Sequence, residues 1–196
     1  MTKSYNTYIF DLDGTLLETL EDLTAAVNYA MRTHGMPEHS LADVRRFVGN
    51  GVKMLMVRAV PSGEANPQFE AAFATFRAYY MDHSLDTTRP YAGIPELLAE
   101  LKSRGKRIAV VSNKFCAATQ SLCRHFFPDT VIEALKQLGV GKENAVYVGD
   151  SEVDLQTARN AGLPCISVLW GFRDRDLLKE NGATTFVAAP LDILSL

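Results

Sequence analysis

The chain has 196 residues, of which 47% are apolar and 22% are charged, and its formal net charge is −3. This size and composition predict a globular protein with one good-sized domain, or a core that carries a small satellite. The slight acidity argues against a nucleic-acid partner or an anionic membrane surface, and no apolar stretch approaches the roughly 18 residues of a membrane span. The short polar N-terminal segment has the character of neither a signal nor a transit peptide, so we expect a cytoplasmic protein.

The first predicted element is a buried strand over residues 8–10, which ends at two aspartates one residue apart. Because a strand alternates its faces, Asp11 and Asp13 should point to the same side. Two carboxylates placed there repel each other unless a cation lies between them, and a hard, oxygen-seeking ion such as Mg²⁺ suits them. Gly14 then permits a sharp turn whose N–H groups can face an anion. The pattern indicates either this metal site or an ordinary Asx-type turn.

The next segment, residues 18–85, has the pattern of helices throughout. Capping patterns mark the starts of three helices, at Thr19 (with Asp22 three residues on), Ser40 and Asn66. The last of these helices carries an aromatic stripe on one face, formed by Phe69, Phe73, Phe76 and Tyr80. Such a stripe predicts the inner face of a small helical bundle.

Another helix is expected over residues 52–60, and two glycines flank Asn50 just before it. They need an explanation because glycine lowers helix stability. An ordinary turn between helices would explain them. So would a loop that reaches the active site and reads the leaving group of the substrate, with Lys53 and Arg58 as partners for a substrate carboxylate.

From residue 91 onward helices and strands alternate, with strands expected over 107–111, 145–148 and 165–169. Alternation of this kind predicts a parallel, doubly wound sheet, in which ligands lie beyond the carboxyl ends of the strands. Asp11, Ser112 and Asp150 each follow a predicted strand. We therefore expect the fold to bring them together.

Three segments in this order resemble motifs of the haloacid dehalogenase-like (HAD) phosphohydrolases. They are Asp-Leu-Asp-Gly-Thr at 11–15 for the first motif, Val-Val-Ser-Asn-Lys at 110–114 for the second and Tyr-Val-Gly-Asp-Ser-Glu-Val-Asp at 147–154 for the fourth. Within that superfamily, residues 47–51 and 168–173 are similar to segments of phosphoglycolate phosphatases.

The resemblance implies an α/β fold, a Rossmann-like doubly wound parallel sheet with an inserted small α-helical cap domain. The catalytic core would comprise residues 1–17 and 86–196, and the cap residues 18–85. Because the insert lies between the first two motifs, the cap would act as a lid that controls the choice of substrate.

The resemblance also implies the chemistry of the acidic residues. Asp11 would be the nucleophile that forms an aspartyl-phosphate, and Asp13 the general acid and base. Mg²⁺ would be held by Asp11, by the backbone carbonyl of Asp13 and by Asp150. Asp154 lies four residues after Asp150, on the same face of a helix, and would support the metal site. Its alternative role is that of a first-turn acid that complements the helix dipole.

The remaining expected contacts concern the phosphate group. Gly14, Ser112 and the N–H of Asn113 would cradle the phosphoryl oxygens. The Thr15 hydroxyl would orient the first loop. Arg173 has the character of a surface arginine.

The third motif of the family, a lysine before proline with a strand ahead of it, has no counterpart in the sequence. A helix similar to the one after the second motif is followed, across Pro128, by one similar to the helix before the fourth. Either the protein has lost that strand and lysine, or the sequence omits a stretch near Phe127 and Pro128. We favour omission, because the residues on each side match their own helices. Lys114 and Lys142 are the nearest substitutes, and neither is assigned the role.

These observations predict a Mg²⁺-dependent phosphomonoester hydrolase that acts on a small soluble phosphorylated metabolite, with 2-phosphoglycolate as the first choice. One alternative is a phosphosugar phosphatase or mutase on the same scaffold. Another is a non-catalytic binding protein, if the third-motif lysine is truly absent. A dehalogenase would not need the second carboxylate, Asp13. The sequence leaves the exact substrate and the oligomeric state open.

Overall fold

The computed structural model describes residues 5–128 and 144–196, so Lys142 lies outside the described residues. The chain divides into two compact units. The first comprises Met1–Glu18, Pro90–Ser112 and Cys123–Leu196, and the second comprises Thr19–Arg89 and Asn113–Leu122. The predicted domain boundaries, 17/18 and 85/86, stay a prediction.

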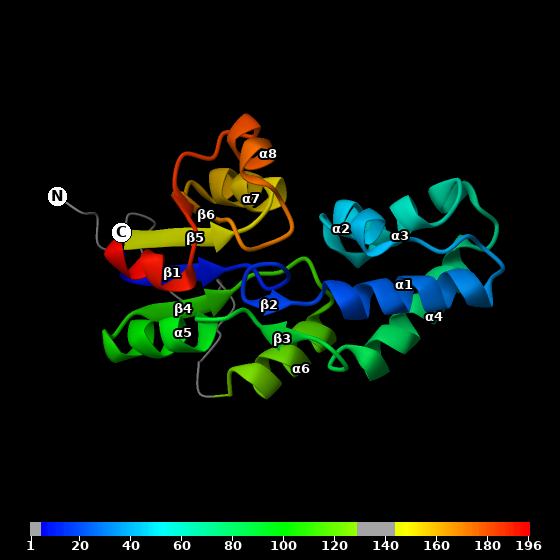
Figure 1. Ribbon diagram of the computed structural model, residues 1–196, viewed down its shortest axis with the longest axis horizontal. Helices are drawn as coiled ribbons and strands as arrows, with labels where there is room; N and C mark the ends of the chain where they lie inside the picture. The colour runs from blue at the N-terminus through cyan, green and yellow to red at the C-terminus, as the bar shows by residue number, and fades with distance from the viewer. Residues whose placement is uncertain (1–4, 129–143) are drawn as a thin grey trace. The chain divides into compact units, whose positions relative to one another are not determined.

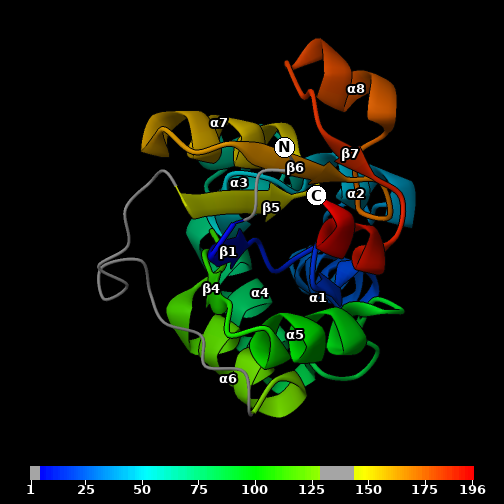
Figure 2. The same cartoon turned by 90° about the vertical axis from the view of Figure 1, so that its left-hand side faces the viewer.

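The first unit is built on a parallel sheet, which in the described residues has five strands in the order β4-β1-β5-β6-β7 (Figures 1 and 2). The strands are β1 (Thr7–Phe10), β4 (Arg107–Val110), β5 (Ala145–Gly149), β6 (Cys165–Val168) and β7 (Phe186–Val187). Strands later in the chain lie on both sides of β1, so the strand order reverses there. The crevice at such a switch point is the usual ligand position in open α/β sheets. The predicted α/β fold is confirmed.

Helices complete this unit. They are α5 (Ile94–Ser103), α7 (Glu152–Ala161), α8 (Arg175–Glu180), the end of α6 (Cys116–Phe126) and a final 3₁₀ helix (Pro190–Ser195). α7 packs against β5 and β6, while α5 packs against β4. One face of the sheet is closed by a core of Ile9, Ala109, Ala145, Tyr147 and Ala158. The strand β1 is buried along its whole length, as its uncharged sequence predicts.

The second unit is helical, as predicted. It contains α1 (Leu20–Thr33), α2 (Leu41–Phe47), α3 (Gly51–Ala59), a 3₁₀ turn (Gly63–Ala65), α4 (Phe69–His83) and the start of α6. α1 packs against α4 and α2. The aromatic stripe of α4 faces this core, since Phe69, Phe76 and Tyr80 are buried. The chain leaves the first unit after β2 (Leu17–Glu18) and returns through β3 (Arg89–Pro90).

The structure corrects the capping contacts predicted for two helices, and the start of one of them. Thr19 precedes α1, but its side chain makes no capping hydrogen bond. The carboxylate of Asp22 instead accepts from the backbone N–H and hydroxyl groups of Thr87 and Thr88, at 2.6–3.2 Å. It thus ties α1 to the segment that leads out of the unit. Asn66 binds the N–H of Gln68, and α4 begins only at Phe69.

The start of α2 agrees with the sequence. The Ser40 hydroxyl accepts from the N–H of Asp43, and the Asp43 carboxylate accepts from the N–H of Ser40, which is a complete capping box. Among the helices of the described ranges, none is both long and apolar enough to cross a bilayer.

Candidate active site

Three carboxylates meet at the carboxyl ends of β1 and β5. Asp11 directly follows β1, Asp150 directly follows β5, and Asp154 lies in the first turn of α7. Each offers an oxygen, and the three oxygens lie within 4.8 Å of one another. The strands place two of them, because β1 and β5 pair in parallel and the N–H of Asp11 donates to the carbonyl of Val148 at 2.9 Å.

The cluster is electrostatically costly without a cation. Burial raises the pKa of Asp150 to about 7 and that of Asp154 to about 6. Burial, then repulsion from Asp154, Asp150 and Asp13, raises the pKa of Asp11 well above its usual range. Because all the donors are oxygens, the residues fit a hard divalent cation, which would favour the ionised carboxylates. Mg²⁺ as the bound ion stays a prediction.

Asp154 both caps a helix and belongs to the acidic cluster. Its carboxylate oxygen Oδ2 accepts from the N–H of Ser151 at 2.9 Å and from the Ser151 hydroxyl at 2.7 Å, so it caps α7. It is also one of the three clustered carboxylates. The capping contacts fix its orientation toward the cluster, and its support of a metal stays a prediction.

The turn after Asp11 packs directly on Asp150. Gly14 has a φ of +85°, and a Cβ there would lie 2.5 Å from the Asp150 oxygen Oδ2, so only glycine fits. Its N–H donates to the carbonyl of Leu17 at 2.9 Å and is therefore used within the turn. The buried Thr15 hydroxyl donates to Oδ1 of Asp150 at 3.4 Å. The role of Thr15 in orienting the first loop stays a prediction.

Comparison with known proteins identifies the family. The family model described as haloacid dehalogenase-like hydrolase matches residues 5–162. The chain belongs to the haloacid dehalogenase-like hydrolases. Phosphoglycolate phosphatase 1 of Pseudomonas aeruginosa is 32% identical over 212 residues, which cover 95% of this chain and 77% of that protein. N-acetylmuramic acid 6-phosphate phosphatase of the same organism is 27% identical, with 96% and 92% covered.

A solved structure agrees with this assignment. The crystal structure of a candidate phosphoglycolate phosphatase from Lactobacillus delbrueckii subsp. bulgaricus has a TM-score of 0.91 and 33% identity, and 97% of each chain is covered. The inserted helices α2, α3 and α4 resemble the cap of the HAD proteins. The predictions of the family and of a phosphoglycolate phosphatase-like enzyme are therefore confirmed.

The comparison also bears on the expected third motif. The alignment with the Pseudomonas phosphatase spans 212 positions, whereas this chain has 196 residues, so at least 16 positions (212 less 196) have no counterpart here. Some of the relative's residues are thus lacking within the aligned region. The stretch in which we expect the third motif falls largely on residues 129–143, which lie outside the described residues.

The predicted phosphate-binding pair lies where the chain changes units. Ser112 follows β4 in the first unit, and Asn113 opens the second. In the second unit, the carbonyl of Asn113 lies 2.9 Å from where a Cβ on Gly51 would stand. Gly51 therefore packs so closely against the backbone of Asn113 that a side chain at this position would clash with it. Phosphate binding by Ser112 and Asn113 stays a prediction.

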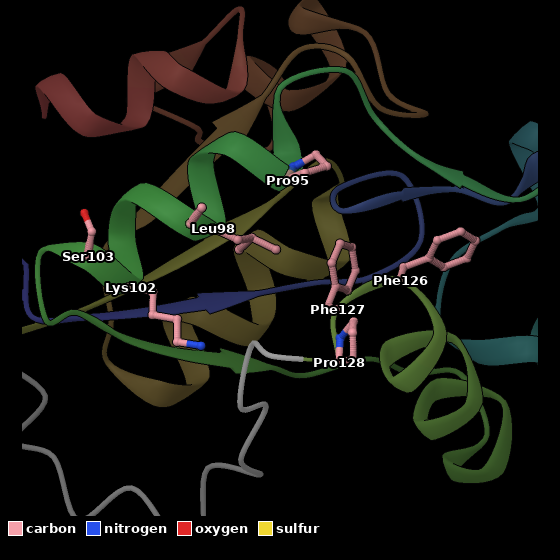
Figure 3. Close-up of a pocket in the computed structure, with 8 residues that line it drawn as sticks. Pro95, Leu98, Lys102, Ser103, Phe126, Phe127 and Pro128 are labelled. Atoms are coloured by element: carbon pink, nitrogen blue, oxygen red, sulfur yellow. The ribbon is translucent and has the colours of Figure 1, made fainter.

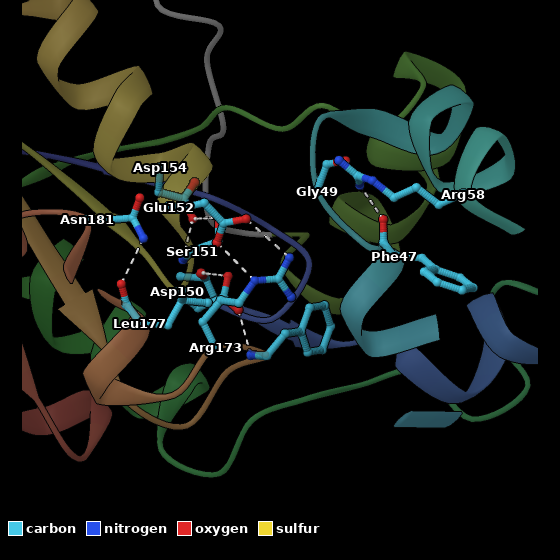
Figure 4. Close-up of polar contacts among 12 residues, drawn as sticks. Phe47, Gly49, Arg58, Asp150, Ser151, Glu152, Asp154, Arg173, Leu177 and Asn181 are labelled. Carbon is cyan, nitrogen blue, oxygen red and sulfur yellow. Dashed lines mark hydrogen bonds and ion pairs between the residues drawn. The ribbon is translucent and has the colours of Figure 1, made fainter. Parts of the chain in front are cut away.

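In the cap of this HAD protein the three candidate substrate residues have different surroundings. Asn50 is exposed, with a φ of +61°, and its side chain makes no capping contact with α3. Lys53 pairs with Glu64 at 2.6 Å. Arg58 donates to the carbonyls of Phe47 and Gly49, and so braces the loop that holds Asn50 (Figure 4). Arg58 therefore has a structural task in the loop, while Asn50 keeps its amide at the surface.

The sequence singled out residues 168–173 only by resemblance and assigned them no contact with the acidic site, and the expectation of a surface Arg173 is wrong. The Arg173 side chain is only 10% exposed and pairs with Glu152 at 2.9 Å (Figure 4). Phe172 donates its N–H to Asp150 at 2.6 Å, and the Trp170 indole N–H donates to the carbonyl of Thr15 at 3.0 Å. The position of residues 170–173 could have indicated their place in the site, because they follow the carboxyl end of β6, where ligands lie in such sheets.

A cavity of about 440 Å³ also lies in the first unit, beside α5 and the end of α6 (Figure 3). It is lined by Pro95, Leu98, Ala99, Lys102, Ser103, Phe126, Phe127 and Pro128. None of the predicted site residues lines it. The cavity is therefore not part of the acidic site.

Proposed function

We propose that this HAD hydrolase is a Mg²⁺-dependent phosphomonoesterase whose substrate is 2-phosphoglycolate. The observation that carries the proposal is the approach of Asp11, Asp150 and Asp154 to within 4.8 Å, at the switch point of the sheet. The names of the relatives at about 30% identity support the choice of substrate. A cytoplasmic location, expected from the sequence, stays a prediction.

In the proposed reaction the Asp11 carboxylate attacks phosphorus and forms an aspartyl-phosphate while the bond to the leaving oxygen breaks. Asp13 gives its proton to that leaving oxygen. It then accepts a proton from the water that hydrolyses the aspartyl-phosphate, which restores both carboxyl groups. Bound Mg²⁺ would balance the charge of the clustered carboxylates and of the phosphoryl oxygens. Asp150 would hold the ion, and Asp154 and Thr15 would keep Asp150 in place.

The second candidate substrate is a phosphosugar. It is favoured by one observation, the 27% identity to N-acetylmuramic acid 6-phosphate phosphatase over 96% of this chain. Both candidate substrates would be hydrolysed at the same acidic cluster. They differ only in the part of the substrate beyond the phosphate, which the cap loop with Asn50 is proposed to recognise.

Phosphate release from three substrates tests the proposal. The substrates are p-nitrophenyl phosphate, 2-phosphoglycolate and a hexosamine 6-phosphate, each assayed with Mg²⁺ and with EDTA. We expect Mg²⁺-dependent release from all three, with the highest kcat/KM for 2-phosphoglycolate. A higher value for the sugar phosphate would replace the substrate assignment. No Mg²⁺-dependent release from any of them would favour a non-catalytic binding protein.

A further inference from the structure

Residues 170–173, here called the 170–173 segment, connect β6 to the acidic site through three separate contacts. The Trp170 indole N–H reaches the first-motif turn at the carbonyl of Thr15, at 3.0 Å. The N–H of Phe172 reaches Oδ2 of Asp150 at 2.6 Å. The segment thus contacts both the turn after Asp11 and the carboxylate after β5. Figure 4 shows the side chains around Asp150 and Arg173.

The third contact is a partly buried ion pair. The Arg173 guanidinium donates twice to the Glu152 carboxylate, from Nε to Oε2 at 2.9 Å and from Nη2 to Oε1 at 3.4 Å. The Arg173 side chain is 10% exposed and that of Glu152 is 35% exposed. Glu152 is the first residue of α7, two residues after Asp150. The pair therefore fastens the segment to the helix that carries Asp154.

The backbone of the segment also lies flush against the site. A Cβ on Gly171 would stand 2.3 Å from the Cβ of Asp150 and 2.4 Å from the carbonyl oxygen of Gly14. No side chain fits between the segment and these two groups. Gly14 and Gly171 therefore both pack directly against the Asp150 carboxylate, and each approaches its Oδ2.

We propose that the 170–173 segment positions the Asp150 carboxylate for metal binding, with Trp170 and Arg173 as positioning residues. The inference rests on the proposed metal site. Mg²⁺ requires nearly ideal ligand geometry, so a carboxylate that can swing loses affinity for it. Removing groups that orient a ligand typically weakens metal binding by about 10- to 100-fold. A lost neutral hydrogen bond, worth about 1 kcal/mol, corresponds to roughly fivefold.

The test is a calorimetric Mg²⁺ titration of the full-length wild type and three variants, with thermal melting of each. Arg173→Ala should bind Mg²⁺ about 10- to 100-fold more weakly, and Arg173→Lys, which keeps the charge, should recover part of the loss. Trp170→Phe, which keeps a ring but loses the N–H, should weaken binding roughly fivefold. The matched control is Arg104→Ala, because Arg104 makes an exposed pair with Glu100 at 2.7 Å. Its Mg²⁺ affinity should stay within about twofold of wild type.

The outcomes separate the inference from the proposed function. If the wild type binds Mg²⁺ and the Arg173 and Trp170 variants bind it equally well, the inference is wrong, even if their melting temperatures fall. If the wild type itself does not bind Mg²⁺, the metal site fails, and the inference fails with it. Should Arg173→Ala not fold, Trp170→Phe decides between the same two results.

Discussion

Replacing Gly14 by alanine should damage the metal site more than the fold. The left-handed conformation at φ +85° costs an L-residue about 1–2 kcal/mol. The new Cβ would also stand 2.5 Å from Oδ2 of Asp150, where ordinary contact begins at 3.4 Å, so this carboxylate must retreat by about 0.9 Å (3.4 less 2.5). Metal–ligand distances tolerate only about 0.2 Å. Mg²⁺ affinity should therefore fall by at least about tenfold.

The assay is urea unfolding in EDTA together with a Mg²⁺ titration, and Gly105→Ala is the matched control. Gly105 has a φ of +69°, but a Cβ there would meet nothing within 4 Å. Gly105→Ala should lose about 1–2 kcal/mol of unfolding free energy, and Gly14→Ala should lose more because its Cβ also overlaps Asp150. Only Gly14→Ala should lose Mg²⁺ affinity. If Gly14→Ala binds Mg²⁺ as tightly as Gly105→Ala does, the packing of Gly14 on Asp150 does not shape the metal site.

Three further predictions concern the same chemistry. Asp13→Asn should lower turnover strongly yet lose less Mg²⁺ affinity than Asp150→Asn, because the proposed ligand of residue 13 is its backbone carbonyl; equal losses in calorimetry would contradict this. Asn50→Ala should lower kcat/KM for 2-phosphoglycolate by roughly ten- to a hundredfold and spare p-nitrophenyl phosphate; an equal fall for both would mean that residue 50 serves cap stability. Burial raises the pKa values of Asp150 and Asp154 above the ordinary 3.8, to about 7 and about 6, so the folded metal-free protein holds protons that the unfolded chain releases. Its melting temperature in EDTA should therefore fall as pH rises from about 4 through about 7, and saturating Mg²⁺ should reverse this trend; a rise in EDTA across that window would contradict the assignment.

The parts of the site that sequence predicted are those that topology brings together. Asp11 and Asp150 each end a strand whose uncharged sequence marks it as buried, and parallel pairing of the strands then places both at one sheet edge. The position of Asp154 beside Asp150 follows from helical spacing, because the two residues are four apart. These relations depend only on local periodicity and on the direction of the strands, so a single sequence carries them.

The missed parts depend on contacts between residues distant in sequence. Thr19 and Asp22 fit a local capping box, but Asp22 instead binds Thr87 and Thr88, 65 and 66 residues away. Arg173 pairs with Glu152, which is 21 residues away. No periodicity encodes such partners, because either side chain would fit a solvated surface equally well. In both cases a tertiary contact, and not the local sequence pattern, determines the partner of the side chain.

The account is tested most directly by the turnover of Asp11→Asn with saturating Mg²⁺ and p-nitrophenyl phosphate, which requires no specific contact with the cap. An amide is a poor nucleophile, so removing the covalent route should lower kcat by more than about 10³-fold. Circular dichroism should show an unchanged fold. A variant that retains the fold and turns over within about tenfold of wild type would contradict the assignment of Asp11 as the nucleophile.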